Sequence, residues 1–303
     1  IFHEGVSLVT SKNKNSEVLS KNILKDIESA DVVIFVGGLD ATWEGEESNK
    51  MRVHNGVDGF FGGDRTKIEL PEVQQNALIE ISKTGKPIIF VLLAGSAISF
   101  NGLEDKLDGI LAAWYPGQRG GDAVADVLFG KYNPAGRLPI TFYSSTNELG
   151  DFEDYNMRAG KGLTYRYYNG EALFPFGHGM SYTKFHYSGL TINSATVSNN
   201  DEIYVSVKVK NIGELDGEEV VQLYIKDVKS NTWMPHKQLR GFARISLKKD
   251  EEKIVNFVLK PRDDLRYYDE IKQDYAVEPG EFEIQIGSSS KDIRLKKTIK
   301  VIY

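Results

Sequence analysis

The sequence contains no cysteine, which excludes disulfide bonds and metal sites built on thiolates. The histidines are few and lack the spacing of metal ligands; they are His3, His54, His178, His186 and His236. No apolar run is long enough to cross a bilayer as a helix. Basic residues are scattered, and acidic residues outnumber them by 43 to 37, which argues against a nucleic-acid or anionic-membrane surface. We therefore expect no metal or other cofactor, no nucleic acid and no membrane as a partner.

The 303 residues suffice for two domains, and the first half has the pattern of alternating strands and helices. Short apolar runs predict buried strands at residues 31–37, 88–93, 109–114 and 138–143. Amphipathic stretches predict helices at residues 71–85 and 121–129. This order predicts an α/β domain over residues 1–143, with a mostly parallel sheet covered by helices in a three-layer sandwich.

The second half changes character after residue 143. Residues 144–186 are rich in Gly, Tyr and Phe with little periodicity, and we interpret them as an irregular connector. From residue 187 to 303, alternating apolar residues and turn signals predict short strands, among them 203–209, 220–225, 254–259 and 282–286. These features predict an all-β sandwich of the fibronectin type III-like kind.

Two loops follow predicted parallel strands, at residues 37–64 and 115–121. Ligands bind beyond the carboxyl ends of such strands, so both loops are candidate functional segments. The first loop places Glu44, Glu46 and Glu47 directly after Trp43. An aromatic neighbour and like charges both favour the protonated form of a carboxyl, as a general acid requires. A solvated acidic loop is the alternative interpretation of these residues.

Many spaced motifs together make the sequence resemble family 3 glycoside hydrolases. The matching segments are 38–46, 64–66, 70–74, 114–121, 123–130, 133–142, 165–167, 174–182, 237–242 and 277–280. They run in the family order and cover nearly the whole chain. The resemblance is to the second, α/β domain of that family and to its fibronectin-like domain, while the family's N-terminal barrel domain is absent from this sequence.

The resemblance implies a retaining β-glycosidase of the β-xylosidase or β-glucosidase type, with two carboxyl groups in its active site. In the family, an aspartate on the barrel is the nucleophile and a glutamate of the α/β domain is the acid/base. Glu44 matches the acid/base position best, and Glu46 and Glu47 are the alternatives. Trp43 either stacks on the sugar or packs into the loop, and Asp64 and Arg65 are expected to order the loop.

One departure from the common family pattern is the long segment 47–63 between the acidic cluster and Asp64. This form resembles a bacterial subgroup labelled xylosidase or glucosidase, and it leaves the alignment of the glutamates open. We also expect the α/β domain to be N-terminally incomplete in this chain. We expect the chain to be inactive alone, and to need a barrel in the same protein or in a separate chain. The family implies a periplasmic or secreted location.

A different class of function is compatible with the same residues. The chain could be a non-catalytic carbohydrate-binding or scaffold protein made from former enzyme domains, although the intact acidic cluster at residues 44–47 argues against this. Nucleotide binding by residues 117–121 is not favoured, because the segment is neither a P-loop nor a full dinucleotide motif. The choice among xylose, glucose and arabinose is left open.

Overall fold

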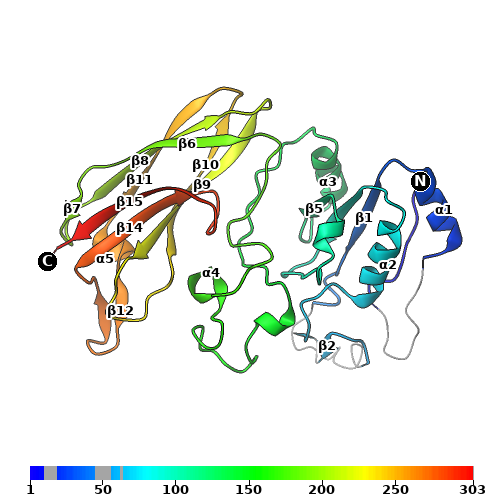
Figure 1. The fold of residues 1–303 in the computed structure, drawn as a ribbon, viewed down its shortest axis with the longest axis horizontal. Helices are drawn as coiled ribbons and strands as arrows, with labels where there is room; N and C mark the ends of the chain where they lie inside the picture. The colour runs from blue at the N-terminus through cyan, green and yellow to red at the C-terminus, as the bar shows by residue number, and fades with distance from the viewer. Residues whose placement is uncertain (10–18, 45–55, 62–63, 303) are drawn as a thin grey trace. The chain divides into compact units, whose positions relative to one another are not determined.

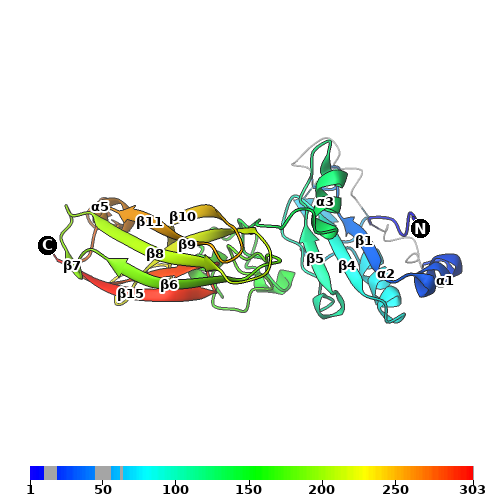
Figure 2. The same cartoon turned by 90° about the horizontal axis from the view of Figure 1, so that it is seen from above.

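The computed structural model describes residues 1–9, 19–44, 56–61 and 64–302, and it forms two compact units (Figure 1, Figure 2). Unit 1 comprises residues 1–128, 142–149 and 171–173. Unit 2 comprises residues 129–141, 150–170 and the chain from Phe174 onward. Among the described residues, no helix has both the length and the hydropathy of a membrane span.

Unit 1 is built on a parallel sheet of three strands in the order β1-β4-β5 (Figure 2). The strands are β1 (Val33–Gly38), β4 (Ile88–Leu93) and β5 (Gly109–Ala112). Phe35 pairs with Phe90 in the register and stacks on it, with ring centroids 5.4 Å apart. Phe90 and Phe100 have no exposed surface and form the centre of this core. The first three predicted strands and their parallel order are confirmed.

Helices and a small hairpin complete unit 1. They are α1 (Lys21–Ser29), α2 (Glu72–Ser82), α3 (Gly120–Leu128), the 3-10 turns Glu104–Lys106 and Thr146–Glu148, and the hairpin of β2 (Phe60–Phe61) and β3 (Asp64–Arg65). The sequence predicted α2 and α3 but not α1, whose first turn is capped by Ser20. α2 begins after Pro71 and buries Val73, Ala77, Leu78 and Ile81. The apolar stripe of α2 is therefore what attaches it to the core.

The fourth predicted strand, at residues 138–143, is wrong. These residues are not a strand of the parallel sheet. The backbone N–H of Leu138 donates to the carbonyl of His178 at 2.8 Å, and its carbonyl accepts from Gly177 at 2.8 Å. Pro139, which has no N–H, follows directly, so the segment cannot continue a ladder. The apolar run predicted a strand because it does not show that the backbone of Leu138 forms its hydrogen bonds with a turn near residue 177.

Unit 2 is a sandwich of two sheets (Figure 1). The five-stranded sheet has the order β10-β9-β14-β15-β7, and the three-stranded sheet has the order β11-β8-β6. The strands are β6 (Phe185–Ile192), β7 (Thr196–Val197), β8 (Ile203–Asn211), β9 (Gly217–Asp227), β10 (Gln238–Leu247), β11 (Glu252–Leu259), β14 (Gly280–Gly287) and β15 (Ile293–Val301). All neighbours pair antiparallel except β15 and β7, which are parallel.

The core of the sandwich follows from period-two alternation. In β8, Ile203, Val205, Val207 and Val209 are buried while Tyr204 is exposed, as the sequence predicted. A hairpin of β12 (Tyr267–Asp269) and β13 (Asp274–Ala276) and the short helices α4 (Thr164–Tyr167) and α5 (Pro261–Asp264) lie outside the two sheets. The predicted fold class, an α/β domain followed by a fibronectin type III-like sandwich, is confirmed.

Candidate active site

The candidate site lies at the carboxyl ends of the three parallel strands of unit 1. Because β1, β4 and β5 are parallel, the segments that leave them begin at the same edge of the sheet. These segments carry Glu44 after β1, Ser96 after β4 and Tyr115 after β5. The structure brings Ser96 and Tyr115 each into contact with Glu44, as described below.

The end of β1 is fixed by backbone contacts and by one buried side chain of α2. Gln74 is 1% exposed; its Oε1 accepts from the N–H of Gly38 at 2.8 Å, and its Nε2 donates to the carbonyls of Gly38 and Leu8 at 2.7 and 2.8 Å. Gly38 has φ +116°, and a Cβ there would lie 2.0 Å from the carbonyl oxygen of Leu93. Only glycine therefore allows this close passage of β1 beside β4.

A tight turn over residues 40–43 follows β1 and contains Trp43. Asp40 Oδ1 accepts from the N–H of Thr42 at 2.8 Å and from its hydroxyl at 2.5 Å, and the N–H of Trp43 donates to the Asp40 carbonyl at 3.0 Å. Trp43 is half-buried, and its ring lies against that of Phe60 with centroids 5.4 Å apart. Whether its remaining surface contacts a sugar stays a prediction.

Glu44 has hydrogen-bond donors at both carboxylate oxygens, and its side chain is only 11% exposed. Oε2 accepts from the N–H of Gly95 at 2.6 Å and from the hydroxyl of Tyr115. Oε1 accepts from the hydroxyl of Ser96 and lies 3.7 Å from Nη1 of Arg65. Glu44 thus joins the segments that follow all three strands.

Arg65 and Tyr115 complete this cluster. Arg65, on β3, donates to the Ser96 hydroxyl at 2.8 Å and to the Ala97 carbonyl at 3.1 Å. Burial lowers the pKa of Arg65, although the nearby Glu44 and Glu69 carboxylates oppose that change. Burial and the hydrogen bond to Glu44 raise the pKa of the Tyr115 hydroxyl, so it remains a donor at neutral pH.

Of the other predicted site residues, Asp64 precedes Arg65 on β3 and is exposed. Glu46 and Glu47 lie outside the described residues. Sequence reasoning did not assign roles to Gly95, Ser96 and Tyr115. Their position directly after the second and third parallel strands is the signal that could have indicated them. Among the described residues, no group of His, Asp and Glu side chains is arranged to hold a metal ion.

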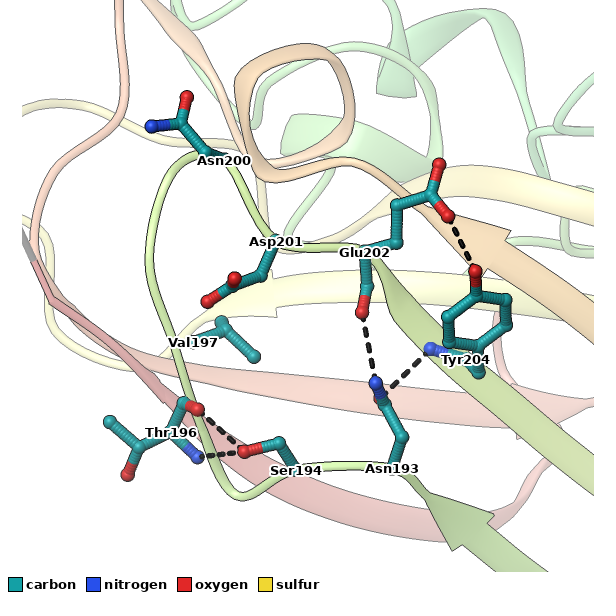
Figure 3. A pocket seen from close by; sticks show the side chains of 8 residues that line it. All are labelled: Asn193, Ser194, Thr196, Val197, Asn200, Asp201, Glu202 and Tyr204. Atoms are coloured by element: carbon teal, nitrogen blue, oxygen red, sulfur yellow. Dashed lines mark hydrogen bonds between the residues drawn. The ribbon is translucent and has the colours of Figure 1, made fainter.

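A hollow lies on unit 2, near β6, β7 and β8 (Figure 3). It has a volume of about 480 Å³ and is lined by Asn193, Ser194, Thr196, Val197, Asn200, Asp201, Glu202 and Tyr204. Its hydrogen bonds join lining residues to one another: Tyr204 donates to Glu202 at 2.6 Å, and Asn193 Nδ2 donates to the Glu202 carbonyl at 3.0 Å. These contacts stabilise the turns themselves, so unit 1 holds the stronger candidate site.

Comparison with known proteins places these units in a family. Residues 6–182 match the glycosyl hydrolase family 3 C-terminal domain, and residues 219–290 match the fibronectin type III-like domain. The chain is 41% identical over 294 residues to a xylan 1,4-beta-xylosidase of Xylanibacter ruminicola, covering 97% of this chain and 32% of that protein. It is also 41% identical over 312 residues to thermostable beta-glucosidase B of Acetivibrio thermocellus, covering 99% and 39%.

Two further similar proteins are β-glucosidases. A periplasmic beta-glucosidase of Salmonella typhimurium is 33% identical over 93% of the chain and 36% of its own length. A solved β-glucosidase structure from Erythrobacter marinus has a TM-score of 0.81 at 29% identity, covering 98% of this chain and 40% of that one. The chain therefore spans between 32% and 39% of the length of these curated relatives. The chain belongs to glycoside hydrolase family 3, of which it contains the C-terminal α/β domain and the fibronectin type III-like domain.

Proposed function

We propose that this chain is the C-terminal portion of a retaining, exo-acting β-glycosidase that removes terminal β-D-xylosyl or β-D-glucosyl residues from oligosaccharides. The observation that carries the proposal is the position of Glu44 at the carboxyl edge of the parallel sheet, where it contacts the segments that follow β4 and β5. The names of the similar proteins, xylosidase and glucosidase, support the substrate class.

The proposed reaction divides two carboxyl groups between two parts of the protein. Retaining glycosidases hold a nucleophile and an acid/base about 5–5.5 Å apart on either side of the scissile bond. The acid/base protonates the leaving oxygen while the nucleophile attacks the anomeric carbon, and then the same group activates water. We assign the acid/base to the loop that holds Glu44, Glu46 and Glu47, and the nucleophile to a barrel domain outside this chain.

This division predicts that the chain alone does not hydrolyse glycosides. The test compares two proteins in the hydrolysis of aryl β-xylosides and β-glucosides. One is the pure chain, and the other is a polypeptide in which the family's N-terminal barrel domain precedes this chain. Hydrolysis by the joined protein only is the expected result. Turnover by the isolated chain would show that both carboxyl groups lie within residues 1–303.

The choice of sugar rests on the exocyclic position, because xylose lacks the hydroxymethyl group that glucose carries. Parallel measurement of kcat/KM for the two aryl glycosides, with an arabinoside as a third, decides the specificity. The expected partners are an oligosaccharide or glycoside and the barrel, in the same protein or in a separate chain. No cofactor is required for this chemistry.

Two finer proposals concern location and domain limits. We propose a periplasmic or secreted protein, which cell fractionation tests directly. We propose residues 1–143 as the α/β domain, 144–186 as the connector and 187–303 as the sandwich domain. Expression of residues 187–303 alone tests the last limit: a cooperative unfolding transition is expected, and an unfolded product would contradict it.

A further inference from the structure

The Glu44 carboxylate has no oxygen that is free of a protein donor. Oε2 lies between the N–H of Gly95, at 2.6 Å, and the Tyr115 hydroxyl, and Oε1 accepts from Ser96 with Arg65 at 3.7 Å. Its side chain is 11% exposed. A general acid must instead direct a protonated oxygen at the leaving group of the substrate. A proton on Glu44 would face one of these existing donors.

The surroundings of Glu44 are built to receive a carboxylate. A Cβ on Gly95 would lie 3.0 Å from Glu44 Oε2 and 2.7 Å from the Tyr115 ring, so a side chain there would displace one of them. The Ser96 hydroxyl donates to Glu44 while it accepts from Arg65 at 2.8 Å. Arg65 in turn donates to the Ala97 carbonyl, which connects the cluster to the segment after β4.

We infer that Glu44 is a positioning residue, which holds the segment after β1 against the ends of β4 and β5 and does not itself transfer the proton. This inference rests on the proposed glycosidase function and narrows it. The sequence favours Glu44 as the acid/base, with Glu46 and Glu47 as alternatives. The inference removes Glu44 from that role and leaves the two alternatives, which lie outside the described residues. Gly95, Ser96, Tyr115 and Arg65 hold Glu44 in place.

The first experiment uses the complete enzyme with the variants Glu44→Gln, Glu46→Gln and Glu47→Gln. Loss of an acid/base slows substrates with poor leaving groups, such as xylobiose or cellobiose, by about 100-fold or more relative to dinitrophenyl glycosides. It also removes the basic limb of the pH profile and allows azide to replace water, which yields a glycosyl azide. One of Glu46→Gln and Glu47→Gln is expected to show all three effects.

Glu44→Gln is expected to behave differently. It should lower kcat/KM by a similar factor for good and poor leaving groups, keep the basic limb and form no glycosyl azide. A leaving-group-dependent loss with azide rescue in Glu44→Gln would make Glu44 the acid/base and overturn the inference. If the unsubstituted complete enzyme hydrolyses none of these glycosides, the proposed function fails, and the following experiment still decides the positioning role.

The second experiment measures thermal unfolding of this chain with Glu44→Gln, Tyr115→Phe and the double variant. In Glu44→Gln, an amide NH₂ replaces an oxygen that now faces a donor, so a melting temperature lower by about 2 °C or more is expected. The two changes should be non-additive, because they remove one contact. Glu28→Gln, on the exposed side of α1, is the matched control and should not shift the transition. Additive effects, or a Glu44→Gln shift no larger than that of the control, would refute the anchoring.

Discussion

Replacement of Gln74 by leucine is expected to destabilise unit 1 strongly, because the glutamine side chain satisfies backbone groups at the end of β1. The substitution keeps the approximate volume but removes the acceptor for the Gly38 N–H and the donor to the Gly38 carbonyl, both buried. Each buried backbone group left without a partner costs about 1–3 kcal/mol. For the two groups together, the expected loss in the free energy of unfolding is therefore roughly 2–6 kcal/mol.

The assay is urea unfolding followed by tryptophan fluorescence. Trp43 and Trp114 report on unit 1, and Trp233 lies in unit 2. Because Trp233 is 71% exposed, a Trp233→Phe background removes its signal at little cost and leaves a probe of unit 1 alone. A probe of one unit is needed because a chain of two units need not unfold in a single step.

The matched control is Gln75→Leu, one position along the same helix. Gln75 is half-buried; it donates to the Leu70 carbonyl at 2.6 Å and accepts from Asn101 at 3.2 Å, where solvent can replace it in part. Its replacement should cost about 1 kcal/mol or less. A loss for Gln74→Leu equal to that of the control would refute the argument that the Gly38 contacts stabilise this end of the sheet.

Three further perturbations test the packing and charges, each by denaturant unfolding. Phe90→Ala should cost about 3–5 kcal/mol because the ring has no exposed surface, whereas Val36→Ala, at a side chain 59% exposed, should cost less than about 1 kcal/mol. Glu219→Gln should cost about 3–5 kcal/mol in unit 2, because it breaks a 2.7 Å ion pair and leaves the buried Arg137 guanidinium without its partner charge. Burial opposes ionisation of Glu69, but hydrogen bonds from Thr146 outweigh it and hold the pKa below the ordinary value of 4.5. Its stabilising effect is thus complete above pH 4.5 and is lost as pH falls through the lower folded-state pKa, and Glu69→Gln should flatten the pH dependence of stability in that acidic range.

Several strands of both units could be predicted from sequence because apolar runs and alternation record burial directly. Residues 88–93 and 203–209 show this, since each coincides with a strand or lies within one. Residues 138–143 have an equally apolar pattern but bond to a turn some forty residues later, and local periodicity contains no information about such a partner. Helix α1 was missed, and its Ser20 cap is recognisable in retrospect.

The candidate site could likewise be predicted only in part. The acidic loop could be located, because it follows a buried strand and its motif resembles a known family. The positions of Gly95, Ser96 and Tyr115 after parallel strands could indicate this edge of the sheet, but their hydrogen bonds to Glu44, 51 to 71 positions away in the sequence, could not be predicted. Which glutamate transfers the proton is a question of side-chain contacts, and residue types alone left it open.

The contacts at the end of β1 also determine which backbone amides can open locally. The N–H of Leu39 donates to the Leu93 carbonyl at 2.7 Å and that of Gly38 to Gln74, so the ladder extends one residue beyond the strand. These amides should exchange their hydrogens only when unit 1 opens globally, whereas Thr42, held by the exposed Asp40, should exchange through local opening. The backbone through Leu39 should therefore stay with the sheet when the exposed turn at Asp40 opens locally.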